Sequence, residues 1–379
     1  MHANVVFPLP GGPVIRYTLP GISPPSISSS SPLTPVGILS ATVLIVFPPC
    51  VHKSFYVLRN KTLLVNNMSI GVFDAHSDLP TYIYEERKNG KTRVLEEKFD
   101  EFFTGISARV MSIWSKPDKR PIILRYSLEA INRLYSDVAE SQRFEIVRSI
   151  KEMEEAIKND KVALWLGLEG GEPIESLDIL EIFYSLGLRV LTLTWSLRNQ
   201  IGDGVFERTN GGITNFGAEV IGKCEELGIL IDVSHLNEAG FWDVLDITGF
   251  PVIASHSNAK SLCDNPRNLT DEQIKAIAER DGVVGITAVA AFVDKDNPTL
   301  EKFIAHVEHV VDLVGYKHVG FGFDFVYYLP EWSGKSVVGL ENERRIPDLI
   351  ERLKENFSEK EVKAIAFDNF KRVFDRVVG

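Results

Sequence analysis

Cysteine is scarce in this chain of 379 residues, which contains only Cys50, Cys224 and Cys263. Three scattered cysteines are too few for a disulfide framework or a structural zinc site, although a single Cys224–Cys263 bridge stays open. Such sparing use of thiols is typical of a reducing compartment, so we expect a cytoplasmic protein. With 44% hydrophobic and 25% charged residues, the composition is that of an ordinary globular protein whose core needs no disulfide support.

An excess of positive charge is lacking as well, because the formal net charge is −11 at pH 7. This balance argues against an extended phosphate-binding surface, and we expect no nucleic-acid partner. The apolar run from Val36 to Phe47 is too short to cross a bilayer, which needs about 20 apolar residues. We therefore expect no membrane partner, and a homodimer stays open.

Acidic residues are missing from the first 67 positions, so all 52 Asp and Glu lie from Met68 onward. The same stretch contains ten of the 19 prolines, a Ser-rich run from Ser26 to Ser31 and four Lys or Arg. It lacks the basic segment and the cleavage site of a secretion signal. We expect residues 1–67 to be a disordered leader or a mis-assigned start, with a transit-like leader as the alternative, and residues 68–379 to form one domain.

From Met68 onward, eight short apolar runs alternate with amphipathic segments. Most runs are rich in Val, Ile, Leu or Phe without strict alternation, which is typical of parallel strands buried on both faces. The runs are 71–75, 107–114, 162–168, 188–194, 229–234, 251–255, 282–289 and 318–323. Eight such strands, each followed by a helix, predict a closed (β/α)₈ barrel of the TIM type. An open doubly wound sheet is the alternative, but it usually has a glycine-rich loop after the first strand, and this chain has none there.

The segments between the runs have sequences that begin and end helices. Thr270 is a predicted N-cap, and Gln273 three residues later completes the capping-box pattern. Gly187 and Gly228 stand where helices should end before the fourth and fifth strands. Two further helical patterns, 344–355 and 359–378, follow the last predicted strand.

Potential metal ligands lie at the carboxyl ends of five of these runs. The ends read His76-Ser77-Asp78, Gly167-Leu168-Glu169, Asp232-Val233-Ser234-His235, Ser255-His256 and Phe323-Asp324. In a barrel these ends converge on one mouth, where active sites of this fold lie. Side chains two apart on a strand point the same way, so His76 and Asp78 can face one ion. Such a set of nitrogen and oxygen ligands suits Zn²⁺, Mn²⁺ or Co²⁺. Six ligands are more than one tetrahedral ion needs, which favours two ions that share one carboxylate.

Any one of these residues by itself is more often a loop cap or a satisfied polar group than a ligand. The agreement of five strand ends is what makes a metal centre the better interpretation. His306 and His309 lie three apart on a predicted helix, and we interpret them as a solvated face rather than as ligands.

At these positions the sequence resembles the membrane (renal) dipeptidase family of metallopeptidases. The matching stretches run in family order from residue 73 to residue 325. They read FDAHSDLP, GLEGG, LTLTW, TNFGAEVI, ILIDVSH, PVIASHSNA, PRNLTDEQ and HVGFGFDF.

The resemblance implies a (β/α)₈ barrel with two zinc ions. One ion is expected on His76, Asp78 and Asp324, and the other on His235 and His256, with Glu169 bridging both. Arg267 matches the arginine that receives the terminal carboxylate of the substrate, a task suited to a guanidinium fork. The implied activity is that of a binuclear dipeptidase with a metal-bridging hydroxide. Asp324 is then the candidate for carrying a proton to the leaving amine.

Two departures from the family pattern stand out. The position after Leu193-Thr194, where well-known members have a His near the reacting carbonyl, is Trp195. After Asp324 the usual Asp-Phe-Asp-Gly becomes Asp324-Phe325-Val326-Tyr327. We expect Trp195 to be a wall of the substrate pocket, because its strand ends at the same mouth as the ligands.

Two other functions stay open. One is another barrel metallohydrolase, acting on a cyclic amide, a nucleobase or a phosphotriester. Such sites commonly begin with His-x-His and carry a bridging carboxylated lysine, where this chain has His76-x-Asp78 and Glu169. The other is a metal-binding homologue without catalysis, which Trp195 keeps open.

Overall fold

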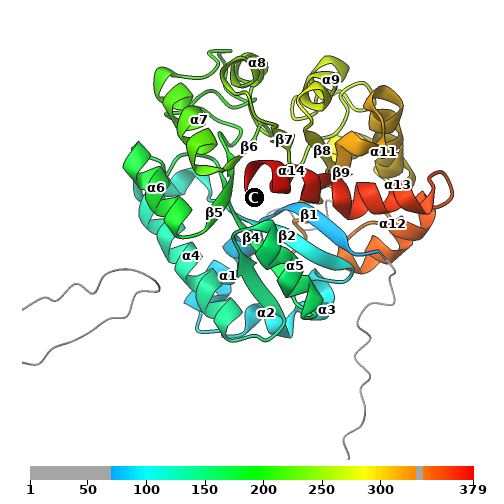
Figure 1. The fold of residues 1–379 in the computed structure, drawn as a ribbon, viewed down its shortest axis with the longest axis horizontal. Coiled ribbons are helices and arrows are strands. Elements are labelled where there is room, and N and C mark those ends of the chain that lie inside the picture. The colour runs from blue at the N-terminus through cyan, green and yellow to red at the C-terminus, as the bar shows by residue number, and fades with distance from the viewer. Residues whose placement is uncertain (1–69, 330–335) are drawn as a thin grey trace, which may run out of the picture. The chain divides into compact units, whose positions relative to one another are not determined.

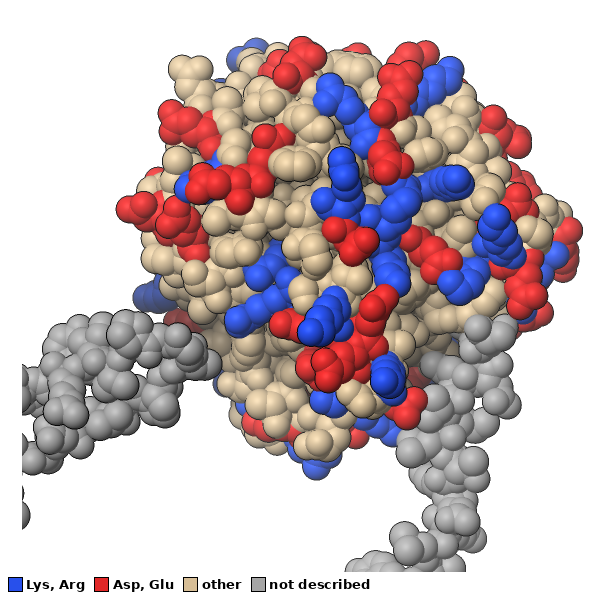
Figure 2. Space-filling model, viewed as in Figure 1, with Lys and Arg blue, Asp and Glu red and all other residues tan. Residues whose placement is uncertain are grey.

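The structure is a computed structural model, and it describes residues 70–329 and 336–379. The predicted leader, residues 1–67, lies outside the described residues. In the described part of the chain, no helix combines the length and the apolar character needed to cross a bilayer. On the face drawn in Figure 2, basic side chains are interspersed with acidic ones.

Nine parallel strands form one sheet, and eight of them close into a barrel surrounded by helices (Figure 1). The strands are β1 (Val72–Ser77), β2 (Ile106–Ile113), β3 (Phe144–Val147), β4 (Val162–Glu169), β5 (Leu188–Thr192), β6 (Leu230–Asp232), β7 (Ile253–Ala254), β8 (Val283–Ile286) and β9 (Val319–Phe321). Their order is β2-β1-β9-β8-β7-β6-β5-β4, and pairing of β2 with β4 closes the ring. The predicted (β/α)₈ barrel is therefore confirmed.

The ninth strand, β3, is one that the sequence did not predict. It is four residues long and pairs with the first half of β4, from Val162 to Trp165. β5 pairs with the same strand only from Leu166 onward, so the lower part of that edge is free for β3. A short run such as Phe144–Val147, with two half-buried positions, is too weak a pattern to separate from a loop.

Helices follow most of the barrel strands and cover the outside of the sheet (Figure 1). Those along the first half of the chain are α1 (Leu79–Lys88), α2 (Val94–Glu97), α3 (Phe99–Phe102), η1 (Pro117–Ile122), α4 (Ile123–Ala139), α5 (Ile150–Lys158) and α6 (Leu177–Ser185). Those along the second half are α7 (Asn215–Leu227), α8 (Glu238–Ile247), α9 (Asp271–Glu279), α10 (Ala290–Val293), α11 (Leu300–Val314), η2 (Tyr316–His318), η3 (Glu343–Arg345), α12 (Ile346–Leu353), α13 (Glu359–Lys363), η4 (Ala364–Asp368) and α14 (Asn369–Val377).

The helix ends follow the local sequence. Thr270 accepts a hydrogen bond from the Gln273 backbone, and the Gln273 side chain returns one, so the predicted capping box is confirmed. Gly228 ends α7 with a φ of 72°, a left-handed conformation that costs glycine little. Cys224 and Cys263 are both free thiols, so the alternative of a bridge between them is not realised.

The C-terminal helix α14 closes the amino-terminal end of the barrel. Figure 1 shows it lying across the middle of the ring of strands. The Phe374 ring lies 4.9 Å from that of Phe73 on β1 and 4.8 Å from that of Trp165 on β4, measured between ring centroids. These aromatic residues fill the half of the barrel interior nearest the amino-terminal ends of the strands. The barrel therefore opens at the carboxyl-terminal ends of its strands.

Candidate metal centre

The six side chains predicted as metal ligands come together at the carboxyl-terminal mouth of the barrel. They are His76, Asp78, Glu169, His235, His256 and Asp324. Glu169 is central: its Oε1 lies 2.8 Å from Nε2 of His235 and 3.4 Å from Nε2 of His256. Nε2 of His76 lies 3.7 Å from the same oxygen. The three imidazoles therefore surround one carboxylate, as expected of a bridging residue.

The side chains fall into two groups that could each hold an ion. In one, ligand atoms of Glu169, His235 and His256 all lie within 4.8 Å of one another. In the other, the same holds for His76, Asp78 and Asp324. The division matches the pairing that the family resemblance implies, with Glu169 beside both groups.

Three serines orient the three imidazoles, and no pattern in the sequence pointed to them. Nδ1 of His76 lies 3.2 Å from Oγ of Ser112, and Nδ1 of His235 lies 2.8 Å from Oγ of Ser196. The third pair, His256 and Ser255, is 2.7 Å apart. Because each Nδ1 is engaged by a serine, each Nε2 is the atom that faces the centre, and outer partners of this kind fix the ring and its tautomer.

Asp232 belongs to a third possible ligand group, with His76 and His256, but its carboxylate is already saturated. Hydroxyls of Thr192 and Ser255 each donate to Oδ2 at 2.6 Å. Backbone amides of Ser234 and Ser255 donate to Oδ1 at 2.9 and 2.8 Å. Since the single proton of the Ser255 hydroxyl is given to Asp232, its oxygen accepts from Nδ1 of His256. Asp232 therefore positions His256 and is not a candidate ligand.

A β-bulge in β1 sets which side chains reach the centre. Asp74 pairs with Arg109 and Ser77 pairs with Met111, so three steps along β1 oppose two along β2. Simple alternation would place Asp74 on the same face as His76. Instead Asp74 turns outward to Arg109, while His76 faces the interior. Bulges commonly redirect side chains beside active sites in this way.

Arg109 is fully buried near the centre, and its guanidinium forms hydrogen bonds to three separate segments of the chain. Its guanidinium donates to Asp74 at 2.8 Å, to the Phe102 carbonyl at 2.7 Å and to Glu343 at 2.9 Å. The other oxygen of Asp74 accepts from the Phe323 backbone at 2.9 Å, immediately before Asp324. Arg109 thus connects β1 and β2 to the segment that carries Asp324 and to η3.

Two of the candidate ligands have a backbone conformation that is rare for residues other than glycine. The φ angles of His235 and Asp324 are 71° and 52°. Conformations of this kind cost on the order of 1 kcal/mol or more and persist where the surroundings impose them, often at functional sites. The chain packs closely just before Asp324: at Gly322 an added Cβ would lie 1.7 Å from the Ser255 carbonyl.

The charges of the centre are poorly balanced by the protein itself. Burial, with Asp78 close by, raises the pKa of Glu169, and burial likewise raises the pKa of Asp324 to about 7. Burial lowers the pKa of His235 and His256, which leaves them neutral. At His76, burial is outweighed by Glu169, Asp78 and Asp324, and the pKa rises to about 10. A divalent cation would relieve the repulsion among these carboxylates.

Missing hydrogen bonds at the centre also indicate a place for a cation. Four buried atoms of the six candidate ligands have no hydrogen-bond partner among the described residues: Nε2 of His76, Oδ1 of Asp78, Oε2 of Glu169 and Oδ1 of Asp324. Buried polar atoms are rarely left without a partner. Carboxylate oxygens offer lone pairs, and the His76 nitrogen offers one when a cation displaces its proton, so the side chains present fit divalent ions.

A cavity of about 90 Å³ adjoins the centre and is lined by both predicted substrate-binding residues, Trp195 and Arg267. Its polar side is formed by Asp78, Glu169, His235, Asp324 and Arg267. Its apolar side is formed by Trp114, Trp195, Phe206, Val289, Phe292, Val326 and Leu329. Arg267 is buried, with one nitrogen donating to the His256 carbonyl at 3.1 Å and Nε unpartnered among the described residues. The cavity thus offers ligand atoms, one guanidinium and an aromatic wall.

The interpretation of His306 as part of a solvated face was wrong. Its side chain is buried, its Nδ1 accepts from the Ala259 backbone at 3.2 Å, and its Nε2 lies 3.0 Å from the Val293 carbonyl. The apolar spacing along α11 did not reveal that loops fold over this position. His309 is partly exposed and pairs with Asp271 at 2.9 Å, so neither histidine reaches the metal centre.

Comparison with known proteins gives a consistent result. The family model described as membrane dipeptidase matches residues 61–378. Dipeptidase verJ of Clonostachys rogersoniana is 32% identical over 67% of this chain and 66% of its own length. An uncharacterized dipeptidase of Schizosaccharomyces pombe is 32% identical over 58% of this chain and 54% of its own. The matched part of the chain thus spans less than two thirds of these curated relatives.

Solved structures match over nearly their whole length. The metallopeptidase called dipeptidase AC has a TM-score of 0.72 and 26% identity, covering 82% of this chain and 99% of its own. A metallopeptidase from Rhodobacter sphaeroides has a TM-score of 0.73 and 25% identity, covering 81% and 99%. That structure contains a phosphinate mimic of the dipeptide L-Ala-D-Ala.

Proposed function

The chain belongs to the membrane dipeptidase family, and from that premise we propose that it is a metal-dependent hydrolase of dipeptides. The observation that carries the proposal is the Glu169 carboxylate at the meeting point of two ligand groups, beside a cavity that also contains a buried arginine. A dipeptide has a free amine and a free carboxylate on either side of its single peptide bond. A site that holds both ends selects for that length.

We propose two ions, most simply Zn²⁺, with Mn²⁺ or Co²⁺ as alternatives. His76, Asp78 and Asp324 would hold one, His235 and His256 the other, and Glu169 both. Bound divalent ions supply Lewis acidity and lower the pKa of water towards neutrality. The serine partners of the imidazoles keep their Nε2 atoms directed inward, so the protein orients the ligands in advance.

Among the residues of the chain, Asp324 and Arg267 have the clearest further tasks. Asp324 is the candidate for delivering a proton to the leaving amine, since it lies at the cavity and has one oxygen without a partner among the described residues. Arg267 is the candidate for the substrate carboxylate, because Nε of its guanidinium is buried and equally unpartnered. The aromatic and aliphatic side of the cavity supports a preference for apolar side chains.

Turnover of a panel of dipeptides with added Zn²⁺, Mn²⁺ or Co²⁺ tests the function directly. We expect hydrolysis of apolar dipeptides such as Gly-Leu, little hydrolysis of tripeptides, and loss of activity with a strong chelator. Hydrolysis of a cyclic amide in place of any dipeptide would favour the other barrel metallohydrolases. Metal binding without turnover of any substrate would favour a non-catalytic homologue.

Replacing Arg267 by Ala should mainly weaken the binding of free dipeptides. Losing one partner of a buried charge pair costs about 2–4 kcal/mol, so KM should rise about 30-fold to 1,000-fold. A dipeptide amide has no carboxylate, so it should bind the wild type poorly and be little affected by the substitution. Equal losses for both substrates in steady-state kinetics would contradict the role of Arg267.

Replacing Trp195 by Phe should leave turnover within about tenfold of the wild type. Trp195 borders the cavity with its ring 5.8 Å from that of Trp114, and phenylalanine keeps most of that surface while deleting only the N–H donor. Trp195→Ala should instead shift preference towards bulkier dipeptides. Loss of a true oxyanion donor typically costs about 10²–10³ in turnover, so a Phe variant slowed a hundredfold with intact metal content would show a chemical role.

A further inference from the structure

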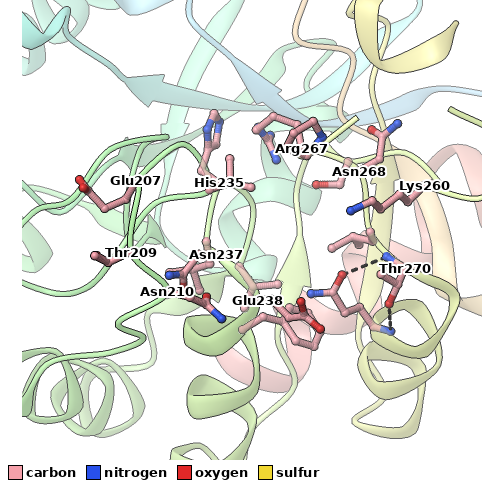
Figure 3. Close-up of a pocket in the computed structure, with 18 of the residues that line it drawn as sticks. Glu207, Thr209, Asn210, His235, Asn237, Glu238, Lys260, Arg267, Asn268 and Thr270 are labelled. Carbon is pink, nitrogen blue, oxygen red and sulfur yellow. Dashed lines mark hydrogen bonds between the residues drawn. The ribbon is translucent and has the colours of Figure 1, made fainter. Parts of the chain in front are cut away.

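A second cavity lies beside the metal centre and is larger than the first, with a volume of about 270 Å³. It shares only His235 and Arg267 with the metal cavity, as far as the described residues go. Its other walls come from residues 205–210, from the beginning of α8 and from residues 257–273. Figure 3 shows Arg267 at the edge of this space nearest the barrel, with Asn237 and Lys260 on opposite sides of it.

Two helices begin at this cavity. Asn237 is the N-cap of α8, with its Oδ1 accepting from the Gly240 backbone at 2.8 Å. Thr270 is the N-cap of α9, with its Oγ accepting from the Gln273 backbone at 3.2 Å. Both caps line the cavity, so the amino-terminal ends of helices of ten and nine residues meet there. The partial positive charge of helix amino termini favours an anion.

Buried polar atoms without a partner provide an independent indication. Nδ2 of Asn237, Oγ of Ser257 and Nε of Arg267 have no hydrogen-bond partner among the described residues. The three residues are only 6%, 1% and 4% exposed. The amide of Asn237 cannot simply be turned over, because its oxygen caps α8, so its nitrogen is a true unpaired donor. Leaving a donor of this kind unsatisfied costs about 1–3 kcal/mol.

Acceptors and charges around the cavity narrow the chemistry of its ligand. Among the buried atoms of the described lining, Oδ1 of Asn268 is the one further atom without a partner, and Nδ2 of the same side chain donates to the carbonyls of Cys263 and Phe292. Arg208, Lys260 and Arg267 carry positive charge, whereas Glu207 and Glu238 carry negative charge. A ligand that joins a carboxylate to an ammonium group satisfies both sets better than a simple anion does.

We propose that this cavity binds a free amino acid, whose carboxylate is held by Asn237, Ser257, Lys260 and the guanidinium of Arg267. Glu238, which lies between Asn237 and Thr270 in Figure 3, would receive the ammonium group. The site is distinct from the metal cavity but has Arg267 as a shared wall. If the proposed dipeptidase function holds, the ligand is chemically the same as a product of the reaction, and its binding draws on the arginine that dipeptides need.

Calorimetric titration of the metal-loaded protein with L-alanine tests the proposal without relying on turnover. We expect saturable binding of L-alanine, weaker binding of acetate and none of methylamine. Asn237→Asp keeps the capping oxygen but replaces the donors by a negative charge, so affinity should fall at least tenfold. Lys260→Ala should lower it severalfold. Lys275→Ala, an exposed lysine of α9 outside the cavity, should bind like the wild type.

Metal content and thermal melting of each variant serve as controls. Should Asn237→Asp fail to fold, Ser257→Ala and Lys260→Ala carry the same test. The proposal is overturned if the wild type shows no saturable binding, or if binding persists in the variants and disappears on chelation, which would locate it at the metal centre. Binding of methylamine as strong as that of L-alanine would also overturn it. Because binding is measured directly, failure of the proposed dipeptidase activity leaves this test unaffected.

Discussion

Replacing Glu169 by Gln should abolish dipeptide hydrolysis. It should also lower the metal content per chain below the two ions expected for the wild type. The amide keeps the volume of the side chain and one oxygen. It removes the negative charge that faces three imidazoles, the nearest of them 2.8 Å away, and places N–H donors among them. Both ligand groups are weakened by one substitution because Glu169 adjoins both. Glu169→Ala should have the same consequence, since it removes both oxygens.

The loss of turnover should be on the order of 10³ or more, because metal ions contribute several kcal/mol to such reactions and each 1.36 kcal/mol is tenfold in rate. Elemental analysis of the purified variant, together with turnover of Gly-Leu, measures both effects. Glu175→Gln, a change of the same kind at an exposed position six residues later, should retain metal and activity. A Glu169→Gln variant that keeps both ions and most of its turnover would remove Glu169 from the bridging role.

Replacing Arg109 by Met should destabilise the folded protein by about 3–5 kcal/mol, the usual cost of leaving a buried charge without its partner. Arg109 is wholly buried and donates to Asp74, Glu343 and a backbone carbonyl. Methionine fills part of the space but satisfies none of these acceptors. Because Asp74 also holds the Phe323 backbone, the segment that carries Asp324 should loosen and metal affinity should fall as well.

The cost of Arg109→Met should depend on pH. Burial raises the pKa of Glu343 to about 7 even with Arg109 opposing it, and loss of Arg109 raises it further. A carboxyl group whose pKa is higher in the folded protein than in the unfolded chain binds more protons in the folded state. The free energy of unfolding therefore falls as the pH rises from the unfolded pKa to the folded pKa. The gap between variant and wild type should therefore be larger at pH 8 than at pH 5.

Urea denaturation at the two pH values measures this difference. Arg198→Met breaks an ion pair with Asp203 in which the arginine side chain is 52% exposed, and because solvent screens such pairs it should affect stability much less than Arg109→Met at either pH. An Arg109→Met variant as stable as the wild type at pH 8 would show that Arg109 is not needed to hold the two carboxylates.

Much of the metal centre could be predicted from local sequence because of the symmetry of the fold. Parallel strands in a barrel bring their carboxyl ends to one mouth, so ligands separated by more than 200 residues, such as His76 and Asp324, can be assigned together from their positions at strand ends. The same reasoning placed Trp195 near the mouth and the family resemblance placed Arg267 there, and both border the metal cavity. Their tasks in binding stay predictions.

Residues that position the ligands could not be found in this way. Ser112 and Ser196 lie 36 and 39 positions from the histidines that they contact, and serine is common in strands and loops. Arg109 and Glu343 are 234 positions apart, and a charged residue inside an apolar run gives no sign of its partner. His306 had the spacing of an exposed helix face, yet a loop covers it.

The sequence by itself determined the barrel, the capping of its helices and the set of candidate ligands, because the alternation of apolar runs with amphipathic segments and the preferences of helix ends are local properties. Only the tertiary structure decided which of these side chains face the centre. The bulge in β1 turned His76 inward and Asp74 outward, and hydrogen bonds from four groups keep the Asp232 carboxylate from serving as a further ligand. Those outcomes depend on which strands lie side by side and on how closely they approach, and neither is written in the spacing of residues along one strand.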